Sequence, residues 1–211
     1  MYVKEIWRYP VKSMAGELLA RASITALGID GDRVVSVLSP QGRVVTARSH
    51  PALLGHKGTT GANGEPLVDG RPWTGSEVLT DVRRIVGPLS ELVYDGSAAR
   101  FDVLPLLAVT DGAIAAFGRD RRRLRPNLVI GGVEGLDERK WPGRKLRIGD
   151  AVINVDSLRS RCVMTTYDPD TLQQDLGVLR DIVDRFDGEL ALNCAVKVGG
   201  VIELNQSVEL L

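Results

Sequence analysis

Glycine, proline and aspartate interrupt this 211-residue sequence so often that few long regular elements can form. Short runs of β-branched residues lie between these breaks, for example residues 33–38 and 44–47, and Ser39-Pro40-Gln41-Gly42 is a suitable hairpin turn between those two. Short strands separated by such turns are typical of packed sheets and barrels. The pattern predicts a β-rich α+β fold of barrel type with a few helices.

Helical patterns are confined to a few segments. Residues 176–186 place their apolar side chains on one helical face, and Gly188 ends the segment. Residues 111–117 resemble the start of a helix with Thr110 as its N-cap. Because helix N-termini favour anions, Thr110 and Asp111 are candidate contacts for cofactor oxygens or phosphate. Residues 76–86 fit a strand or a helix, and the glycine-rich stretch 58–76 fits a surface loop or an irregular hairpin.

The charge balance and the cysteine count exclude several classes of function. The 27 basic residues equal the 27 acidic ones, so nothing predicts bulk attraction to nucleic acid or an anionic membrane. The N-terminal charges are too closely spaced for a signal peptide, and no apolar run reaches membrane-spanning length. We therefore expect a cytoplasmic protein. Its two cysteines imply no disulfide framework and cannot supply the four ligands of an ordinary iron–sulfur cluster.

Cys162 is the first candidate for chemistry. Arg159 and Arg161 precede it, and a short β-type run follows that ends at Asp168-Pro169-Asp170. Two guanidinium groups would favour the thiolate, which attacks electrophiles and binds soft metals. The alternative is that a lone cysteine is a small buried hydrophobe, the reading we adopt for Cys194 within its strand.

Basic residues at two other places are candidate anion contacts. Lys12 and Ser13 follow Pro10 and could hold a phosphate, although a solvated lysine and a turn serine are the alternative. Arg125 offers a planar fork before a strand, and Asn127 offers a donor and an acceptor. The run Arg121–Arg123 is expected to be a solvated face. His50 and His56 lack metal-ligand partners at suitable spacing, so both are expected to be surface or structural residues.

The segment from Ser160-Arg161-Cys162 through Thr165-Thr166 to Asp168-Pro169-Asp170-Thr171 resembles the molybdenum-cysteine segment of the MOSC-domain family. That family includes the mitochondrial amidoxime-reducing component, its bacterial relatives and the C-terminal domain of molybdenum cofactor sulfurases. Four further motifs occur in the family's order: Tyr9-Pro10-Val11-Lys12-Ser13 with Gly16, Gly28 to Asp32-Arg33, Thr46-Ala47-Arg48 with Pro51, and Arg123-Leu124-Arg125-Pro126-Asn127, where Leu124 replaces an aromatic residue.

The resemblance implies a molybdenum cofactor (molybdopterin) ligated by the Cys162 thiolate. It also implies an N-terminal MOSC-type β subdomain, residues 1–95, packed on a MOSC β-barrel domain, residues 96–211, with the cofactor between them. By this likeness and the helix-start argument, the cofactor contacts are Lys12, Ser13, Arg33, Arg48, Thr110, Asp111, Arg125, Asn127, Ser160, Arg161 and Cys162.

The implied activity is reduction of N-hydroxylated small molecules, with electrons from an external donor protein because this chain has no haem, flavin or iron–sulfur motif. The alternative is a cofactor carrier or sulfur-transfer module with a persulfide on Cys162, and a third reading is a β-barrel binding domain that has lost the cofactor. The sequence departs from the family at three places: Ala113 replaces a serine, Val34 replaces an aromatic residue, and Asn205-Gln206 replaces a Gly-Asp pair.

Overall fold

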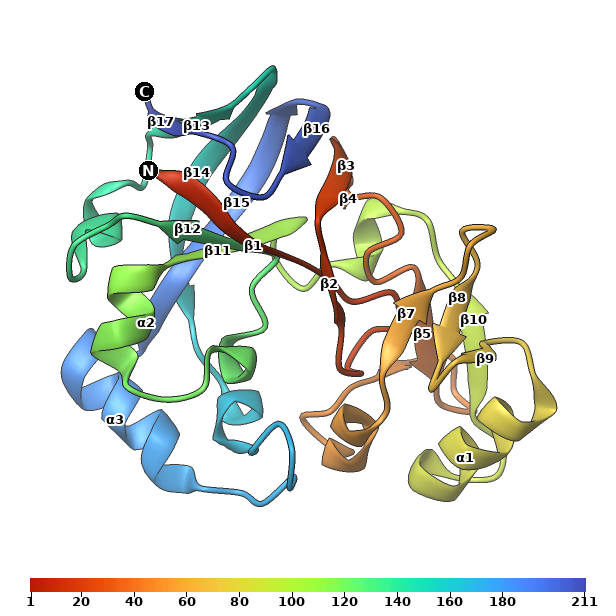
Figure 1. Cartoon of the computed structure of the whole chain (residues 1–211). Coiled ribbons are helices and arrows are strands. Elements are labelled where there is room, and N and C mark those ends of the chain that lie inside the picture. The colour runs from red at the N-terminus through yellow and green to blue at the C-terminus, as the bar shows by residue number, and fades with distance from the viewer.

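One eight-stranded sheet forms the larger part of the computed structural model, which describes residues 1–211 (Figure 1). Its strand order is β17-β13-β14-β15-β11-β12-β1-β2, and only β11 and β12 pair in parallel. In that order the strands are Val208–Leu210, Lys145–Ile148, Ala151–Ser160, Glu189–Val198, Leu106–Thr110, Leu128–Gly131, Tyr2–Arg8 and Glu17–Leu19. This confirms the β-rich fold class predicted from the sequence.

Three small sheets accompany the large one. The first, β10-β5-β6, contains Glu91–Tyr94, Val35–Leu38 and Val44–Val45, with the predicted hairpin turn at 39–42. The second, β16-β3-β4, contains Gly200–Glu203, Arg21–Thr25 and Gly28–Ile29. The third, β7-β8-β9, contains Gly58–Thr60, Pro66–Val68 and Arg71–Pro72. Of the two structures expected for the glycine-rich stretch, the hairpin is the one that forms, extended by a third short strand into a small antiparallel sheet.

Three α-helices and five 3-10 turns complete the fold. Residues 76–86, whose pattern fitted a strand or a helix, form helix α1 (Ser76–Val86). Helix α2, Asp111–Phe117, has the predicted Thr110 cap, and α3, Leu176–Phe186, buries the predicted apolar face. In Figure 1, α2 and α3 lie with the large sheet, and α1 lies at the opposite end of the molecule. The 3-10 turns are η1 Pro51–Gly55, η2 Ala98–Arg100, η3 Arg121–Leu124, η4 Asp137–Lys140 and η5 Val163–Thr166.

The buried apolar side chains form three clusters. The largest joins the large sheet to β3, β4 and β16 and includes Ile6, Ile24 and Trp141. The second packs β5, β6 and α1 together through residues such as Val37 and Val78. The third lies beneath α2 and α3. Burial of these side chains supplies most of the favourable free energy of folding.

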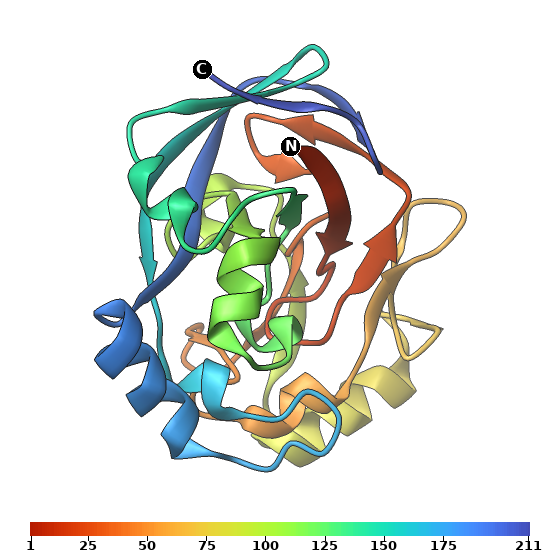
Figure 2. The ribbon, with the colours of Figure 1, turned by 60° about the vertical axis from the view of Figure 1, so that its left-hand side comes forward.

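The first thirty residues contribute to the large sheet as well as to the N-terminal part of the chain. Strand β1 pairs with β12, and β3 pairs with β16. The two ends of the chain lie close together (Figure 2). The Val208 amide donates to the Met1 carbonyl at 3.0 Å. The division at residue 95 stays a prediction, and both parts of the chain share the core cluster around Ile6 and Ile24. None of the helices has the length and apolar character needed to cross a membrane.

Candidate cofactor site around Cys162

Cys162 lies two residues beyond the end of β14, a long inner strand of the large sheet. The chain then turns through η5 instead of forming the expected β-type run. The physical reason is local: the Thr165 hydroxyl and amide both donate to the Cys162 carbonyl, at 2.9 and 3.0 Å. The Thr166 hydroxyl donates likewise to the Val163 carbonyl at 2.6 Å. These bonds close a tight turn that leaves the Cys162 side chain partly exposed at a strand end.

A cavity of about 100 Å³ opens at the Cys162 side chain, and its wall is strongly basic. Seven of the lining residues are basic and one is acidic. Of the eleven predicted contacts, nine line this cavity: Lys12, Ser13, Arg33, Arg48, Arg125, Asn127, Ser160, Arg161 and Cys162. Segments far apart in the sequence are therefore brought together at one thiol.

Thr110 and Asp111 do not line this cavity. The Thr110 hydroxyl accepts from the Ala113 amide at 3.1 Å, and its own amide donates to Glu138 at 2.6 Å. Asp111 accepts from the amides of Gly132 and Val133, at 2.9 and 3.1 Å. Both residues hold the start of α2 against the turn after β12, so their polar groups are already satisfied within the fold.

Asp102 is the single acidic residue of the cavity, and no motif in the sequence predicted it. One carboxylate oxygen lies 2.7 Å from Lys12 Nζ, and the other lies 2.6 Å from Arg48 Nη2. Burial would raise the pKa of Asp102, but the hydrogen bond from Lys12 and the charges of Lys12 and Arg48 hold it below its ordinary value. The pKa of Arg48 is raised above its ordinary value. The largest cause is its contact with Cys162, and the charge of Asp102 adds to it. Asp102 thus fixes two of the predicted cofactor contacts.

Arg33 is held by the carboxylate of Asp32, with which it forms an ion pair. Asp32 is fully buried, and its other oxygen accepts from the Tyr9 amide at 2.7 Å. Asn127 is also buried and uses its whole amide group: its oxygen accepts from Leu107 and Arg33, and its nitrogen donates to Trp7 and Asp32. Asn127 therefore ties β1, β11 and β12 together at the cavity wall.

The Tyr9 ring lies beneath two guanidinium groups. Arg125 lies 4.4 Å and Arg33 5.0 Å from its centroid, within the range of cation–π attraction. Burial raises the pKa of Tyr9 to about 12, although both arginines act to lower it. Ser13 and Arg33 adopt left-handed backbone conformations, with φ of 72° and 55°. These conformations turn the chain sharply at Ser13 and at Arg33, and both residues line the cavity.

Three arginines of the cavity have no carboxylate partner. Arg125 donates to the Met14 carbonyl at 2.6 Å, Arg159 to Asn193 at 3.4 Å and Arg161 to the Leu124 carbonyl at 2.8 Å. Burial lowers the pKa of Arg125 and of Arg161 to about 10. The Nε and Nη1 atoms of Arg161 are buried without any hydrogen-bond partner. Buried donors are rarely left unpaired, so Arg161 fits an anionic group that supplies the missing acceptors.

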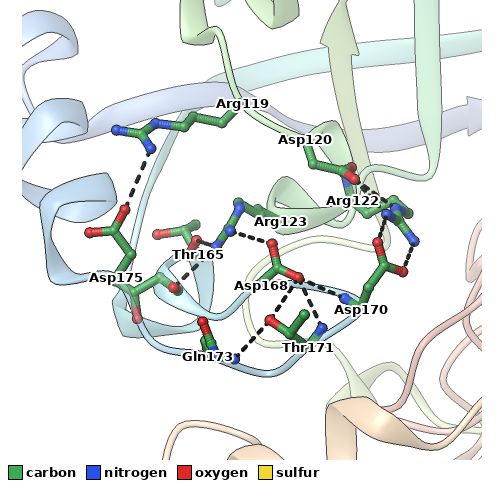
Figure 3. Close-up of polar contacts among 11 residues, drawn as sticks. Arg119, Asp120, Arg122, Arg123, Thr165, Asp168, Asp170, Thr171, Gln173 and Asp175 are labelled. Carbon is green, nitrogen blue, oxygen red and sulfur yellow. Dashed lines mark hydrogen bonds and ion pairs between the residues drawn. The ribbon is translucent and has the colours of Figure 1, made fainter.

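The run Arg121–Arg123 is the expected solvated face only in part: the side chains of Arg121 and Arg122 are 36% and 37% exposed, but all three arginines form ion pairs. Arg122 forms ion pairs with Asp120 and Asp170, and Arg123 forms one with Asp168 at 2.8 Å (Figure 3). Only 10% of the Arg123 side chain is exposed. Asp168 and Asp170 lie more than 40 residues further along the chain, so no local pattern could reveal these pairs.

The donor set suits a molybdenum cofactor better than a free metal ion. No cluster of three or more His, Cys, Asp or Glu residues is arranged to hold a metal. Cys162 is a single soft ligand, so a metal at this thiol needs further ligands from a cofactor. The unpaired arginines supply positive charge for the anionic groups of such a molecule.

The chain matches the MOSC N-terminal beta barrel domain over residues 1–67 and the MOSC domain over residues 113–209. It therefore belongs to the MOSC-domain family, as its cysteine segment predicted. Its relatives include mitochondrial amidoxime reducing component 2 of Macaca fascicularis and mitochondrial amidoxime-reducing component 1 of Homo sapiens, each 25% identical. Both alignments cover 80% of this chain and 67% of the relative. Among solved structures, YuaD of Bacillus subtilis is similar in fold, with a TM-score of 0.55, 13% identity and coverage of 99% and 94% of the two chains.

Proposed function

We propose that this protein binds the molybdenum cofactor through Cys162 and reduces N-hydroxylated small molecules. The observation that carries the proposal is the set of three arginines without carboxylate partners around the Cys162 cavity, one of them with two unpaired buried nitrogens. The amidoxime reducing components named above support the reductase half of the proposal by relationship.

Each part of the cavity has a role in this proposal. The Cys162 thiolate holds the metal, and Arg125, Arg159 and Arg161 neutralise the anionic groups of the cofactor. Lys12 and Arg48, both fixed by Asp102, add positive charge at the cavity wall. When bound, the cofactor supplies the two-electron redox chemistry, and the protein positions and tunes it.

The overall reaction converts an N–OH group and two protons to N–H and water, with two electrons from an external donor protein. The small-molecule substrate, this donor and the cytoplasmic location stay predictions. Absence of nucleic-acid and membrane partners is a prediction as well.

Turnover with an artificial reductant tests the proposal. The protein is produced in a host that makes the cofactor, and its reduction of a benzamidoxime-like compound is followed as loss of substrate. Arg161→Met removes the unpaired guanidinium, and Arg147→Met, at an exposed position of the inner strand β13, is the matched control. We expect reductase activity in the wild type and the control, and loss of cofactor and activity in Arg161→Met.

A carrier or sulfur-transfer module gives a different result. Such a protein would retain cofactor, show no turnover with any reductant, and transfer the cofactor to a cofactor-free enzyme. Transfer without reduction would replace the reductase proposal by the carrier reading.

A further inference from the structure

A second cavity of about 620 Å³ adjoins the Cys162 cavity. Its wall comes from both parts of the chain: β1 and β2 on one side, η1 and β7 on another, and η3 with the segment after Cys162 on a third. Arg123, Arg125 and Met164 line both cavities and form the wall between them. This volume lies within the range of small-molecule sites.

Apolar groups make up much of the second cavity's surface. Trp7 and Tyr9 lie nearly parallel, with ring planes 15° apart and centroids 6.3 Å apart. The polar atoms of both rings are occupied, because the indole nitrogen donates to Glu5 at 2.7 Å and the phenol donates to the Pro126 carbonyl at 3.1 Å. Both rings are almost fully buried, so the accessible apolar surface comes from Leu18, which is 56% exposed, and from the partly buried Leu54 and Tyr167. These surfaces favour a flat, largely apolar ligand.

Most charges on the second cavity's wall are already paired. Glu17 lies 2.9 Å from Arg8, and Asp170 lies 2.7 Å from Arg122. Arg123 is paired with Asp168, and Figure 3 shows this pair beside that of Arg122 with Asp170. The cavity's two acidic groups are thus neutralised.

Two cations of the second cavity have no carboxylate partner, and they differ in exposure. Arg125 is largely buried between the two cavities, over the face of Tyr9. Lys57 is exposed, and its ammonium group forms no ion pair. Four basic residues against two acidic ones give this wall a net positive charge. A ligand with one negative group would be stabilised by Lys57.

We propose that the second cavity is a small-molecule site for a planar aromatic compound carrying one negative charge. The ligand packs on Leu18, Leu54 and the Tyr167 ring and places its anionic group at Lys57. This site is separate from cofactor binding and goes beyond the proposed function.

Fluorescence of Trp7 reports binding directly, because Trp7 is the one tryptophan that lines the second cavity. The full-length protein is titrated with 2-naphthoate, and with 2-naphthylmethylamine as the cation of similar shape. We expect saturable quenching by the carboxylate and at least about tenfold weaker binding of the amine. Trp7→Phe should abolish the quenching signal while the protein stays folded.

Charge reversal of the lysine locates the anionic group. We expect Lys57→Glu to weaken 2-naphthoate binding by about tenfold, whereas Lys197→Glu, an exposed unpaired lysine on β15, should leave it unchanged. No quenching at millimolar 2-naphthoate, equal affinity for the amine, or equal effects of the two lysine variants would each overturn the proposal. The test needs no cofactor and no turnover, so its failure is distinguishable from failure of the reductase proposal.

Discussion

The Arg123 guanidinium lies 2.8 Å from the Asp168 carboxylate, across the turn that follows Cys162. The same guanidinium donates to the carbonyls of Thr165 and Thr166, at 3.4 and 3.1 Å (Figure 3). Asp168 in turn accepts from the amides of Asp170 and Thr171. One largely buried side chain of η3 therefore holds the whole segment after the thiol.

Arg123→Gln should loosen this segment. The change leaves the Thr165 and Thr166 carbonyls without their charged donor, so we expect the free energy of unfolding to fall by about 2 kcal/mol. Cofactor content should fall with it, because η5 positions Cys162. Urea unfolding and molybdenum analysis measure the two effects.

Arg119→Gln is the matched control for Arg123→Gln. Arg119 is 42% exposed and forms only a distant pair with Asp175 at 3.4 Å. Exposed pairs of this kind contribute less than about 1 kcal/mol. Equal effects of the two variants would contradict a special role for Arg123.

Arg161→Met should separate cofactor binding from stability. In cofactor-free protein the unpaired buried guanidinium is costly, so we expect an equal or higher free energy of unfolding in the variant. In protein from a cofactor-producing host, cofactor content should fall. Thermal unfolding of the cofactor-free protein and pterin fluorescence of the loaded protein provide the measurements. Marked destabilisation with unchanged pterin content would show that Arg161 is only a structural residue.

Glu138 should make stability depend on pH. Burial raises the pKa of Glu138 from 4.5 to about 7, although hydrogen bonds from Thr110 oppose this. The folded protein therefore holds this proton more tightly than the unfolded chain between these pH values. The contribution of Glu138 to the free energy of unfolding must then fall as pH rises from about 4.5 to 7, and stay constant above.

Glu138→Gln removes this titration and keeps an acceptor for the Thr110 amide. A pKa difference of one unit between the folded and unfolded states corresponds to about 1.4 kcal/mol of stability. As the pH rises from about 4 to 8, we therefore expect the free energy of unfolding of the variant to increase by about 3 kcal/mol relative to that of the wild type. Urea unfolding of both proteins across this range measures the difference. A constant difference between the two proteins at all pH values would contradict the raised pKa.

The sequence predicted the elements whose causes are local. The Thr110 cap, the apolar face of α3 and the turn at 39–42 each depend on residues a few positions apart. Family motifs also predicted nine residues of the Cys162 cavity, among them Arg33 and Arg161. For the cap, the helix face and the turn, the pattern and the fold depend on the same short-range interactions, whereas the cavity residues were predicted by family resemblance.

Long-range pairing could not be predicted from the sequence. Asp102 meets Lys12 across 90 residues, and Arg123 meets Asp168 across 45, without any local signal. The prediction of a β-type run after Cys162 was wrong, because the hydroxyls of Thr165 and Thr166 donate to carbonyls three residues earlier and form the turn η5. Threonine favours strands by itself, but these hydrogen bonds override that preference.

Molybdenum content of two serine variants tests the central claim most directly. Cys162→Ser exchanges a soft, partly exposed thiol for a hard hydroxyl, whereas Cys194→Ser changes a buried core position on β15. Each protein is purified from a cofactor-producing host and analysed for molybdenum per chain and for the metal–sulfur signal at the molybdenum absorption edge. We predict about one molybdenum per chain in the wild type and in Cys194→Ser. In Cys162→Ser the cysteine–metal bond should be lost and the metal strongly depleted. An unchanged metal content and edge signal in Cys162→Ser would contradict the assignment of Cys162 as the metal ligand.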